Sequence, residues 1–156
     1  GDAGNDTLVA GSGEFQYLFG GNDDDSLIGG NGTDTADFGG NATGVIVNLS
    51  SAASRIGGSG QYVDYAASKG AVDSFTIGLG REVAAEGIRV NVVRPGIIDT
   101  EIHASGGQPD RARQASPQLP MRRAGTAQEV ARAIMWRLSE EASYTTMSLI
   151  DVSGGR

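Results

Sequence analysis

The chain has 156 residues, with 12 Lys and Arg, 19 Asp and Glu and a formal net charge of −7. This length suits one domain of ordinary size or two very small ones, and the acidic balance argues against a nucleic-acid partner. Cysteine is absent, which excludes disulfides and Cys-ligated metals. No apolar run reaches the length of a membrane span, so we expect no membrane association.

The charge is divided unevenly along the chain. Residues 1–44 contain eight acidic side chains, no basic side chain and twelve of the 25 glycines. Residues 45–156 contain 12 basic and 11 acidic side chains and are therefore close to neutral. This contrast predicts two units of different kinds joined in one chain, one over residues 1–44 and one over residues 45–156.

The first unit repeats with a period of about nine residues. GDAGNDTLV at residues 1–9 is followed by GGNDDDSLI at 20–28 and by GGNGTDTAD at 29–37. Residues 10–19 form a ten-residue version without Asp. Glycine permits positive φ at successive turns, and the leucines point into a thin core. The pattern resembles the calcium-binding nonapeptide repeats of repeats-in-toxin proteins, which implies a short β-roll of glycine-rich repeats.

Aspartates in this unit are candidate calcium ligands. Each repeat of such a roll is half a coil, so the first and third repeats share a side, which stacks Asp6 on Asp25. The other side pairs the degenerate second repeat with Asp34. Calcium takes about six to eight oxygen ligands, so the resemblance implies Ca²⁺ binding through Asp6, Asp25 and Asp34. An acidic, glycine-rich and disordered segment is the alternative interpretation.

The second unit opens with a candidate catalytic constellation. Residues 45–49 are apolar and mostly β-branched, which predicts a buried strand, and Ser51 follows its end. A helix restarts near Tyr65, and its spacing places Tyr65 and Lys69 on one helical face. A phenol loses its proton near a pKa of about 10, and a neighbouring cation lowers that pKa. These residues therefore suit general acid–base catalysis on a carbonyl or alcohol.

The order of strand, Ser-Ser, glycine-rich loop and Tyr-x-x-x-Lys resembles the short-chain dehydrogenase/reductase family. The resemblance runs from about residue 44 to 156 and is greatest to glucose-dehydrogenase-like members. It implies an α/β fold that forms the C-terminal half of a Rossmann-type doubly wound parallel sheet. It also implies that Ser51, Tyr65 and Lys69 are catalytic. One extra residue lies between Ser51 and Tyr65 relative to the commonest family spacing, so Ser50 stays open as an alternative.

Further elements follow in the order of that family. A helix is predicted over residues 62–86, with Gly87 as its C-cap, and a buried strand over 88–93. Residues 148–155 contain a final strand and match the family's terminal signature. The closely packing face of the helix is predicted to consist of Ala66, Gly70, Ala71 and Phe75.

A turn after the second strand is the expected cofactor contact. Residues 95–100 match the family's Pro-Gly-x-x-x-Thr turn, which by resemblance lies against the nicotinamide and its phosphates. The resemblance thus implies NAD or NADP as cofactor, bound by Tyr65, Lys69, Pro95, Gly96, Ile98 and Thr100.

The last third of the chain contains a polar segment and a capped helix. Residues 101–123 correspond to the mobile substrate lid of the family, and we assign no role to His103 within it. Thr126 and Glu129 form a capping box that predicts a helix start. Met147 stands where the family usually has Gly. Apolar residues expected in the core are Val130, Ala133, Ile134, Trp136 and Leu138.

The adenosine side of the dinucleotide site, which the family builds in its first half, has no counterpart in the sequence. We expect residues 45–49 to form an unpaired sheet edge for this reason. One hypothesis is an NAD(P)-dependent oxidoreductase of small alcohols or carbonyls, inactive as this isolated chain. Its partners would be a completing chain or further copies of itself. A calcium-dependent structural or secretion-associated module and an artefactual fusion are the alternatives. The second unit favours a cytoplasmic location and the repeats an extracellular one.

Overall fold

The computed structural model describes residues 7–9, 15–19, 26–28, 33–37 and 44–156. The strands are β1 (Thr7–Val9), β2 (Phe15–Phe19), β3 (Ser26–Ile28), β4 (Thr33–Asp37), β5 (Val45–Leu49), β6 (Arg89–Pro95), β7 (Ile98–Asp99), β8 (Gly125–Thr126) and β9 (Leu149–Val152). The α-helices are α1 (Ala53–Ile56), α2 (Val63–Val83), α3 (Ile102–Ser105), α4 (Arg111–Ala115) and α5 (Ala127–Leu138). The 3-10 turns are η1 (Ala84–Glu86), η2 (Ser116–Gln118) and η3 (Glu140–Ala142).

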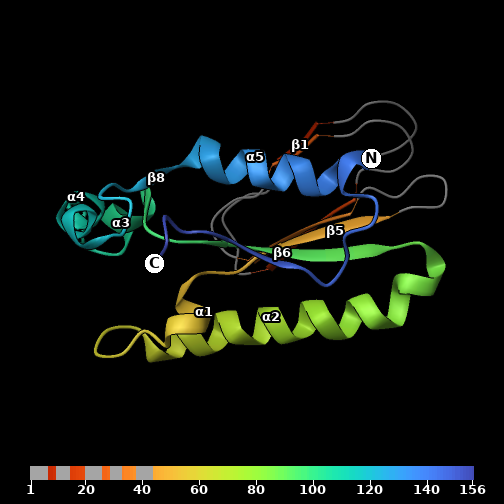
Figure 1. Cartoon of the computed structure of the whole chain (residues 1–156), viewed down its shortest axis with the longest axis horizontal. Helices are drawn as coiled ribbons and strands as arrows, with labels where there is room; N and C mark the ends of the chain where they lie inside the picture. The colour runs from red at the N-terminus through yellow and green to blue at the C-terminus, as the bar shows by residue number, and fades with distance from the viewer. Residues whose placement is uncertain (1–6, 10–14, 20–25, 29–32, 38–43) are drawn as a thin grey trace.

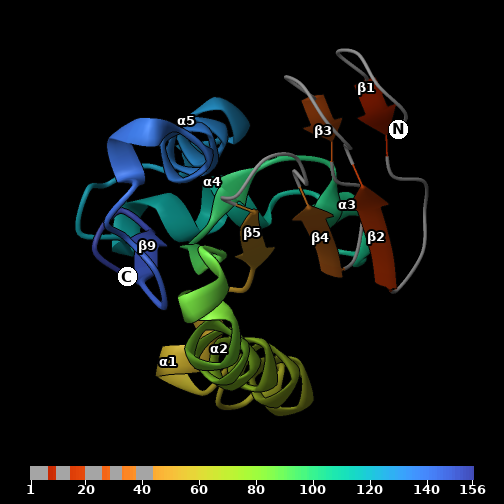
Figure 2. The ribbon, with the colours of Figure 1, turned by 90° about the vertical axis from the view of Figure 1, so that its right-hand side faces the viewer.

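A five-stranded sheet in the order β2-β4-β5-β6-β9 forms the centre of the molecule. Strands β5, β6 and β9 run parallel to one another. Helix α5 lies on one face of these strands and helix α2 on the other (Figures 1 and 2). The expected α/β architecture with a parallel sheet is confirmed for the second unit.

The strands of the repeats pair in alternation. Strand β1 pairs with β3, and β2 pairs with β4, each in parallel. The first repeat thus lies beside the third and the second beside the fourth, which is the pairing that a roll of half-coil repeats predicts.

Strand β4 also pairs with β5, in the antiparallel direction, through Asp37 and Ile46. The expected unpaired edge at β5 is therefore wrong. Edge strands offer free donors and acceptors to any neighbouring strand, and here the strand that immediately precedes β5 in the sequence takes that place.

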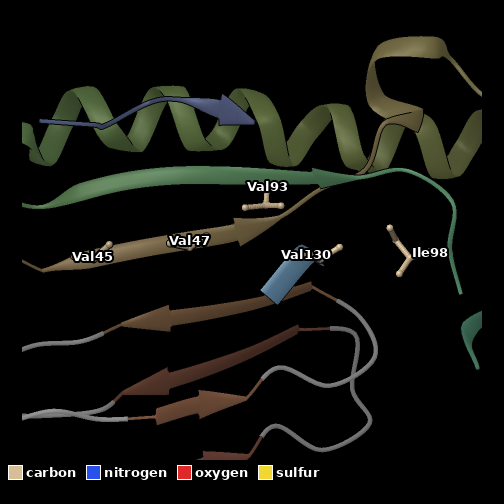
Figure 3. Packing of buried hydrophobic residues seen from close by; sticks show 5 residues of the cluster. All are labelled: Val45, Val47, Val93, Ile98 and Val130. Carbon is tan, nitrogen blue, oxygen red and sulfur yellow. The ribbon is translucent and has the colours of Figure 1, made fainter. Parts of the chain in front are cut away.

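The apolar core lies between the sheet and α5 (Figure 3). Its buried members Val45, Val47 and Val93 alternate with residues of the opposite face, as the period of two along a strand requires. Ile98 and Val130 complete the cluster, and partly buried residues around it include Ile134 and Leu138. The capping box is present: the Thr126 hydroxyl accepts from the Glu129 amide and the Glu129 carboxylate accepts from the Thr126 amide.

Helix α2 buries the predicted Ala66 and half-buries Gly70, but Ala71 and Phe75 of the predicted face are exposed. Its buried residues are Ala66, Lys69, Asp73, Thr76 and Gly80, whereas Phe75 is 50% exposed. The sheet face beneath α2 carries Asn48 and Arg94 beside Val90 and Val92, and the helix turns the hydrogen-bonding Thr76 and Asp73 toward the two polar residues. As predicted, Gly87 ends this segment in the left-handed region, with φ of 81°.

One aromatic residue, Trp136, and one turn residue, Met147, also differ from what the sequence or the family pattern leads us to expect. Trp136 is 39% exposed and lies outside the core, whereas its neighbour Arg137 is only 3% exposed and donates to the Ser148 hydroxyl. Met147, in place of the family's usual Gly, adopts a φ of 54°. A Cβ on Gly80 would lie 2.5 Å from the Met147 Cγ, so the missing side chain at Gly80 makes room for the Met147 side chain.

Candidate active site

Tyr65 and Lys69 lie on neighbouring turns at the start of α2. The Lys69 Nζ is 5.8 Å from the centroid of the Tyr65 ring and donates a hydrogen bond to the Leu49 carbonyl at 3.1 Å. Lys69 is 8% exposed and Tyr65 is 41% exposed. The helical spacing thus places a largely buried cation behind a phenol that solvent reaches.

Hydrogen bonds from β5 fix this part of α2. The Ser50 hydroxyl, which is buried, donates to the Lys69 carbonyl at 3.0 Å. Further along the helix, the Asn48 Nδ2 donates to the Thr76 Oγ1 at 2.9 Å. These bonds set the position of Lys69 relative to the carboxyl end of β5.

The two serines after β5 have different environments. The Ser50 hydroxyl is committed to the Lys69 carbonyl. Ser51 is only partly buried, and its Oγ accepts from the Ala53 amide at 3.1 Å. Within the described part of the chain the Ser51 hydroxyl donates to no protein acceptor, so its proton is available to a substrate oxygen. The geometry therefore favours Ser51 over Ser50 as the third member of the constellation.

The Pro95–Thr100 turn lies beside Ser51. The Ala52 amide donates to the Pro95 carbonyl at 2.9 Å, so the ends of β5 and β6 meet at one edge of the sheet. A Cβ on Gly96 would lie 2.7 Å from the Ser153 Cα, which only glycine avoids. Ile98 is buried and Thr100 is exposed. The sequence-predicted catalytic and cofactor residues thus come from one edge of the molecule.

The polar segment 101–123 contacts the start of α2. The Gln108 Nε2 donates to the Tyr62 hydroxyl at 3.0 Å, and the Arg111 guanidinium lies 5.1 Å from the centroid of the Tyr62 ring. Tyr62 precedes Tyr65 by three residues, about one helical turn. Sequence reasoning missed these contacts, because no short-range pattern relates residues 46 positions apart. His103 approaches the Ile98 carbonyl at 2.8 Å.

Burial lowers the pKa of arginines in this structure. Burial lowers the pKa of Arg137, and the nearby Arg89 lowers it further. Arg94, by contrast, pairs with Asp73 through its Nη2 at 2.8 Å and its Nε at 3.1 Å. The Arg94 pair joins β6 to α2 close to the candidate site.

Hollows in the described part of the chain lie away from Tyr65. A hollow of about 420 Å³ lies at the amino end of β6, lined by Arg89, Glu140 and Tyr144 among others. A second of about 170 Å³ lies between Met121 and Asp151. The phenol and the serine define the candidate site, and they lie at the opposite end of the strands from the larger hollow.

Only one of the three candidate calcium ligands lies among the residues that the structure describes. Asp6 and Asp25 lie outside the described residues, and Asp34 lies in β4 opposite Gln16 of β2. Among the residues that the structure describes, no three His, Cys, Asp or Glu gather as a metal site.

Comparison with known proteins identifies the family. The family described as Enoyl-(Acyl carrier protein) reductase matches residues 37–156. Together with the parallel sheet, this match shows that the chain belongs to the short-chain dehydrogenase/reductase family.

Curated relatives match the same region. An uncharacterized oxidoreductase of Escherichia coli, YgfF, is 61% identical over 117 residues, which cover 75% of this chain and 47% of that protein. The 3-oxoacyl-[acyl-carrier-protein] reductase FabG of Salmonella typhimurium is 41% identical over 112 residues, which cover 72% of this chain and 45% of that protein. The chain thus spans about half the length of these relatives.

Solved structures confirm a Rossmann-type fold over part of a domain. A blue fluorescent protein from a metagenomic library, in complex with NADPH, has a TM-score of 0.64 at 30% identity over 72% of this chain and 44% of its own. An NADPH-bound short-chain oxidoreductase of Pseudomonas aeruginosa, with an atypical catalytic centre, has a TM-score of 0.63 at 30% identity, covering 71% and 45% of the two chains. Searching the described helices for a membrane-spanning segment finds none.

Proposed function

We propose that residues 45–156 are the proton-transfer portion of an NAD(P)-dependent oxidoreductase of alcohols and carbonyls. The observation that carries the proposal is the buried Lys69 ammonium, 5.8 Å from the ring of the partly exposed Tyr65. An ammonium beside a phenol favours the phenolate, so Tyr65 can give up its proton to a carbonyl oxygen. In the reverse direction it accepts the proton of an alcohol.

Ser51 supports the same chemistry from the other side of the substrate. Its hydroxyl is delivered by the end of β5 and is partly accessible. A hydroxyl donor at this position would hold the carbonyl oxygen in place and favour its developing negative charge. NAD(P), when bound, supplies or accepts the hydride. The roles of Ser51, Tyr65 and Lys69 are the proton and orientation part of that exchange.

The cofactor fits one side of this site. The exposed Thr100 hydroxyl and the Pro95–Gly96 turn stand next to Ser51, which suits the nicotinamide end. The neighbour of β5 on the other side is the antiparallel β4, and residues 44–156 offer no glycine-rich strand-to-helix turn for the pyrophosphate. We therefore propose that these residues are inactive alone and need a dinucleotide-binding half, supplied by a partner chain or by sequence that precedes them.

A titration of NADPH fluorescence tests this proposal. The chain alone should give no saturable binding. The chain mixed with the residues of the E. coli relative YgfF that precede the matched region should bind NADPH and reduce simple ketones. Saturable micromolar binding by the chain alone would overturn the proposed inactivity. Failure of the mixture to bind or react would overturn the proposed function.

Tyr65→Phe is the matched variant for this experiment, because it keeps the ring and removes the proton. In the completed complex it should keep NADPH binding and lose ketone reduction by about 100-fold or more. Unchanged reduction in Tyr65→Phe would remove Tyr65 from its assigned role.

Residues 1–44 support a second proposal, which is calcium binding by the repeats. The parallel pairing of β1 with β3 and of β2 with β4 favours it. Calcium titration followed by circular dichroism should raise the β signal, and the triple variant Asp6→Asn/Asp25→Asn/Asp34→Asn should abolish the rise. Absence of any calcium response would reject the site. Failure of both experiments would leave a fusion with neither activity.

A further inference from the structure

A cation of the polar segment 101–123 lies next to the start of the helix that carries Tyr65. The Arg111 guanidinium stacks on the Tyr62 ring at 5.1 Å. Tyr62 is the N-cap of α2 and stands three positions before Tyr65 in the sequence. The Arg111 Nη1 donates to the Gln108 Oε1 at 2.7 Å, and Gln108 in turn donates to the Tyr62 hydroxyl. These three contacts hold Arg111 beside the first residue of the Tyr65 helix.

The charge of Arg111 is not neutralised by a carboxylate of the described residues. Arg113, two positions along the same helix, pairs with Asp110 at 2.9 Å, whereas no ion pair includes Arg111. Its charged neighbour is a second cation: burial lowers the pKa of Arg156, and the nearby Arg111 lowers it further. The main-chain oxygen of Arg156 accepts hydrogen bonds from Arg55 and from the Ser153 hydroxyl. This oxygen is therefore engaged by those two groups and not by Arg111.

The unpaired charge has chemical consequences. A guanidinium presents five donors in a planar fork that matches carboxylate and phosphate oxygens. Gln108 accepts a hydrogen bond from one edge of the Arg111 guanidinium, and the Tyr62 ring covers one of its faces. The remaining donors of a cation that is already positioned lose little freedom when an anion binds.

We propose that Arg111 binds an anionic group of the substrate, so that the substrate class is alcohols or carbonyl compounds bearing a carboxylate or phosphate. This inference rests on the proposed function, since it places the anion site at the N-terminal end of the helix that carries Tyr65. It assigns Arg111 to substrate binding and Tyr62 and Gln108 to its positioning.

The test compares a charged ketone with a neutral one of the same shape. Acetoacetate and acetoacetamide are each titrated into the isotope-labelled full chain without coenzyme, and amide and arginine side-chain resonances are followed by NMR. Acetoacetate should give saturable shifts at Arg111 and Tyr62, and acetoacetamide should bind at least tenfold more weakly. Equal binding of both compounds, or shifts confined to other arginines, would overturn the inference.

Matched variants separate the binding site from general charge. Arg111→Gln should weaken acetoacetate binding at least tenfold, while Arg113→Gln, with the same change of charge on the same helix, should change it less than twofold. Arg111→Lys keeps the charge without the fork and should give an intermediate affinity. Circular dichroism confirms that each variant is folded. Equal losses in Arg111→Gln and Arg113→Gln would reduce the effect to non-specific attraction and contradict the inference.

The coenzyme experiment distinguishes two kinds of failure. Acetoacetate binding that depends on Arg111, without NADPH binding by the completed complex, would reject the proposed function and leave the anion site in place. An active complex that reduces acetoacetate and acetoacetamide equally well would keep the proposed function and reject the anion site.

Discussion

The two faces of the parallel strands are held by different interactions. Against α5, the carboxyl half of the sheet buries valines and isoleucines, with Val93 fully buried. Against α2, the same strands present Asn48 and Arg94, which bond to Thr76 and Asp73, together with the fully buried Val90 and Val92. Apolar burial is strong but tolerates small displacements, whereas hydrogen bonds fix distance and direction. Tyr65, the proposed proton donor, is carried by the helix that is attached through directional contacts.

The two faces of the sheet therefore differ in how they contribute to stability and to the positioning of α2. The face against α5 contributes free energy of folding mainly through apolar burial, whereas the face against α2 adds directional bonds that also set the register of α2 on β5 and β6. Variants on the two faces should therefore differ in kind as well as in size.

The largest expected effect is on the polar face, at the Asp73–Arg94 pair. Asp73→Ala leaves a guanidinium of 16% side-chain exposure without its main partner, and we expect a loss of about 3 kcal/mol in the free energy of unfolding. Urea denaturation measures this loss. The double variant Asp73→Leu/Arg94→Met should be more stable than Asp73→Ala, because it removes the buried charge as well. A double variant less stable than Asp73→Ala would show that the pair stabilises by more than mutual compensation.

On the apolar face, Val93→Ala should cost about 2 kcal/mol, through lost burial and an unfilled cavity. Val63→Ala is the matched control, since Val63 on α2 is 63% exposed, and it should cost less than about 0.5 kcal/mol. Urea midpoints compare the two. Similar losses for the two variants would contradict the assignment of the core to the α5 side.

Removing a single directional bond should have a smaller effect. Thr76→Val keeps the side-chain shape and removes the Asn48–Thr76 hydrogen bond, which should cost about 1 kcal/mol in the free energy of unfolding. Ser74→Val removes a hydroxyl from an exposed position of the same helix and should change stability by less than about 0.5 kcal/mol. If urea denaturation gives equal changes for both, the Asn48–Thr76 bond does not help to hold α2.

The smallest effect concerns the exposed start of α5 and depends on pH. The Arg123 guanidinium, followed by the Thr126 amide, lowers the pKa of Glu129 to about 2. Because the pKa of Glu129 is lower in the folded state than its ordinary value of 4.5, its stabilising contribution is complete above pH 4.5 and is lost as the pH falls toward about 2. Thermal unfolding should show Glu129→Gln less stable than the parent at pH 7 and equal to it near pH 2.

Glu141→Gln, the same change at an exposed residue of η3, is the control for net charge in this experiment. A gap between the parent and Glu129→Gln that stays constant from pH 7 to pH 2 would contradict the role of the ionised Glu129.

Local signals predicted much of this structure. Alternating apolar residues located β5 and β6, Gly87 marked the end of the long helix, and the Thr126–Glu129 spacing gave the start of α5. The Tyr65–Lys69 contact followed from helical geometry alone. Each of these depends on residues that are near one another in the sequence.

Features that depend on a distant partner were not predicted. Hydrophobicity placed Phe75 inward on α2, but the sheet beneath presents Asn48 and Arg94, so Thr76 and Asp73 are buried instead. Next to the exposed Trp136, Arg137 is buried because Asn91 and Ser148, which are distant in the sequence, accept its hydrogen bonds. The stacking of Arg111 on Tyr62 and the pairing of β4 with β5 are long-range contacts without a sequence signature.

The direction of β4 restricts how the sheet can be extended. Seven residues, 38–44, separate β4 from β5, and an antiparallel pair can be joined by so short a connection, whereas a parallel pair needs a crossover of about a dozen residues or more. The polypeptide immediately upstream of β5 therefore cannot supply a co-directional strand at this border. A co-directional strand at this border has to come from outside the segment that directly precedes β5 and has to displace β4, so completion of a parallel sheet would begin as strand exchange.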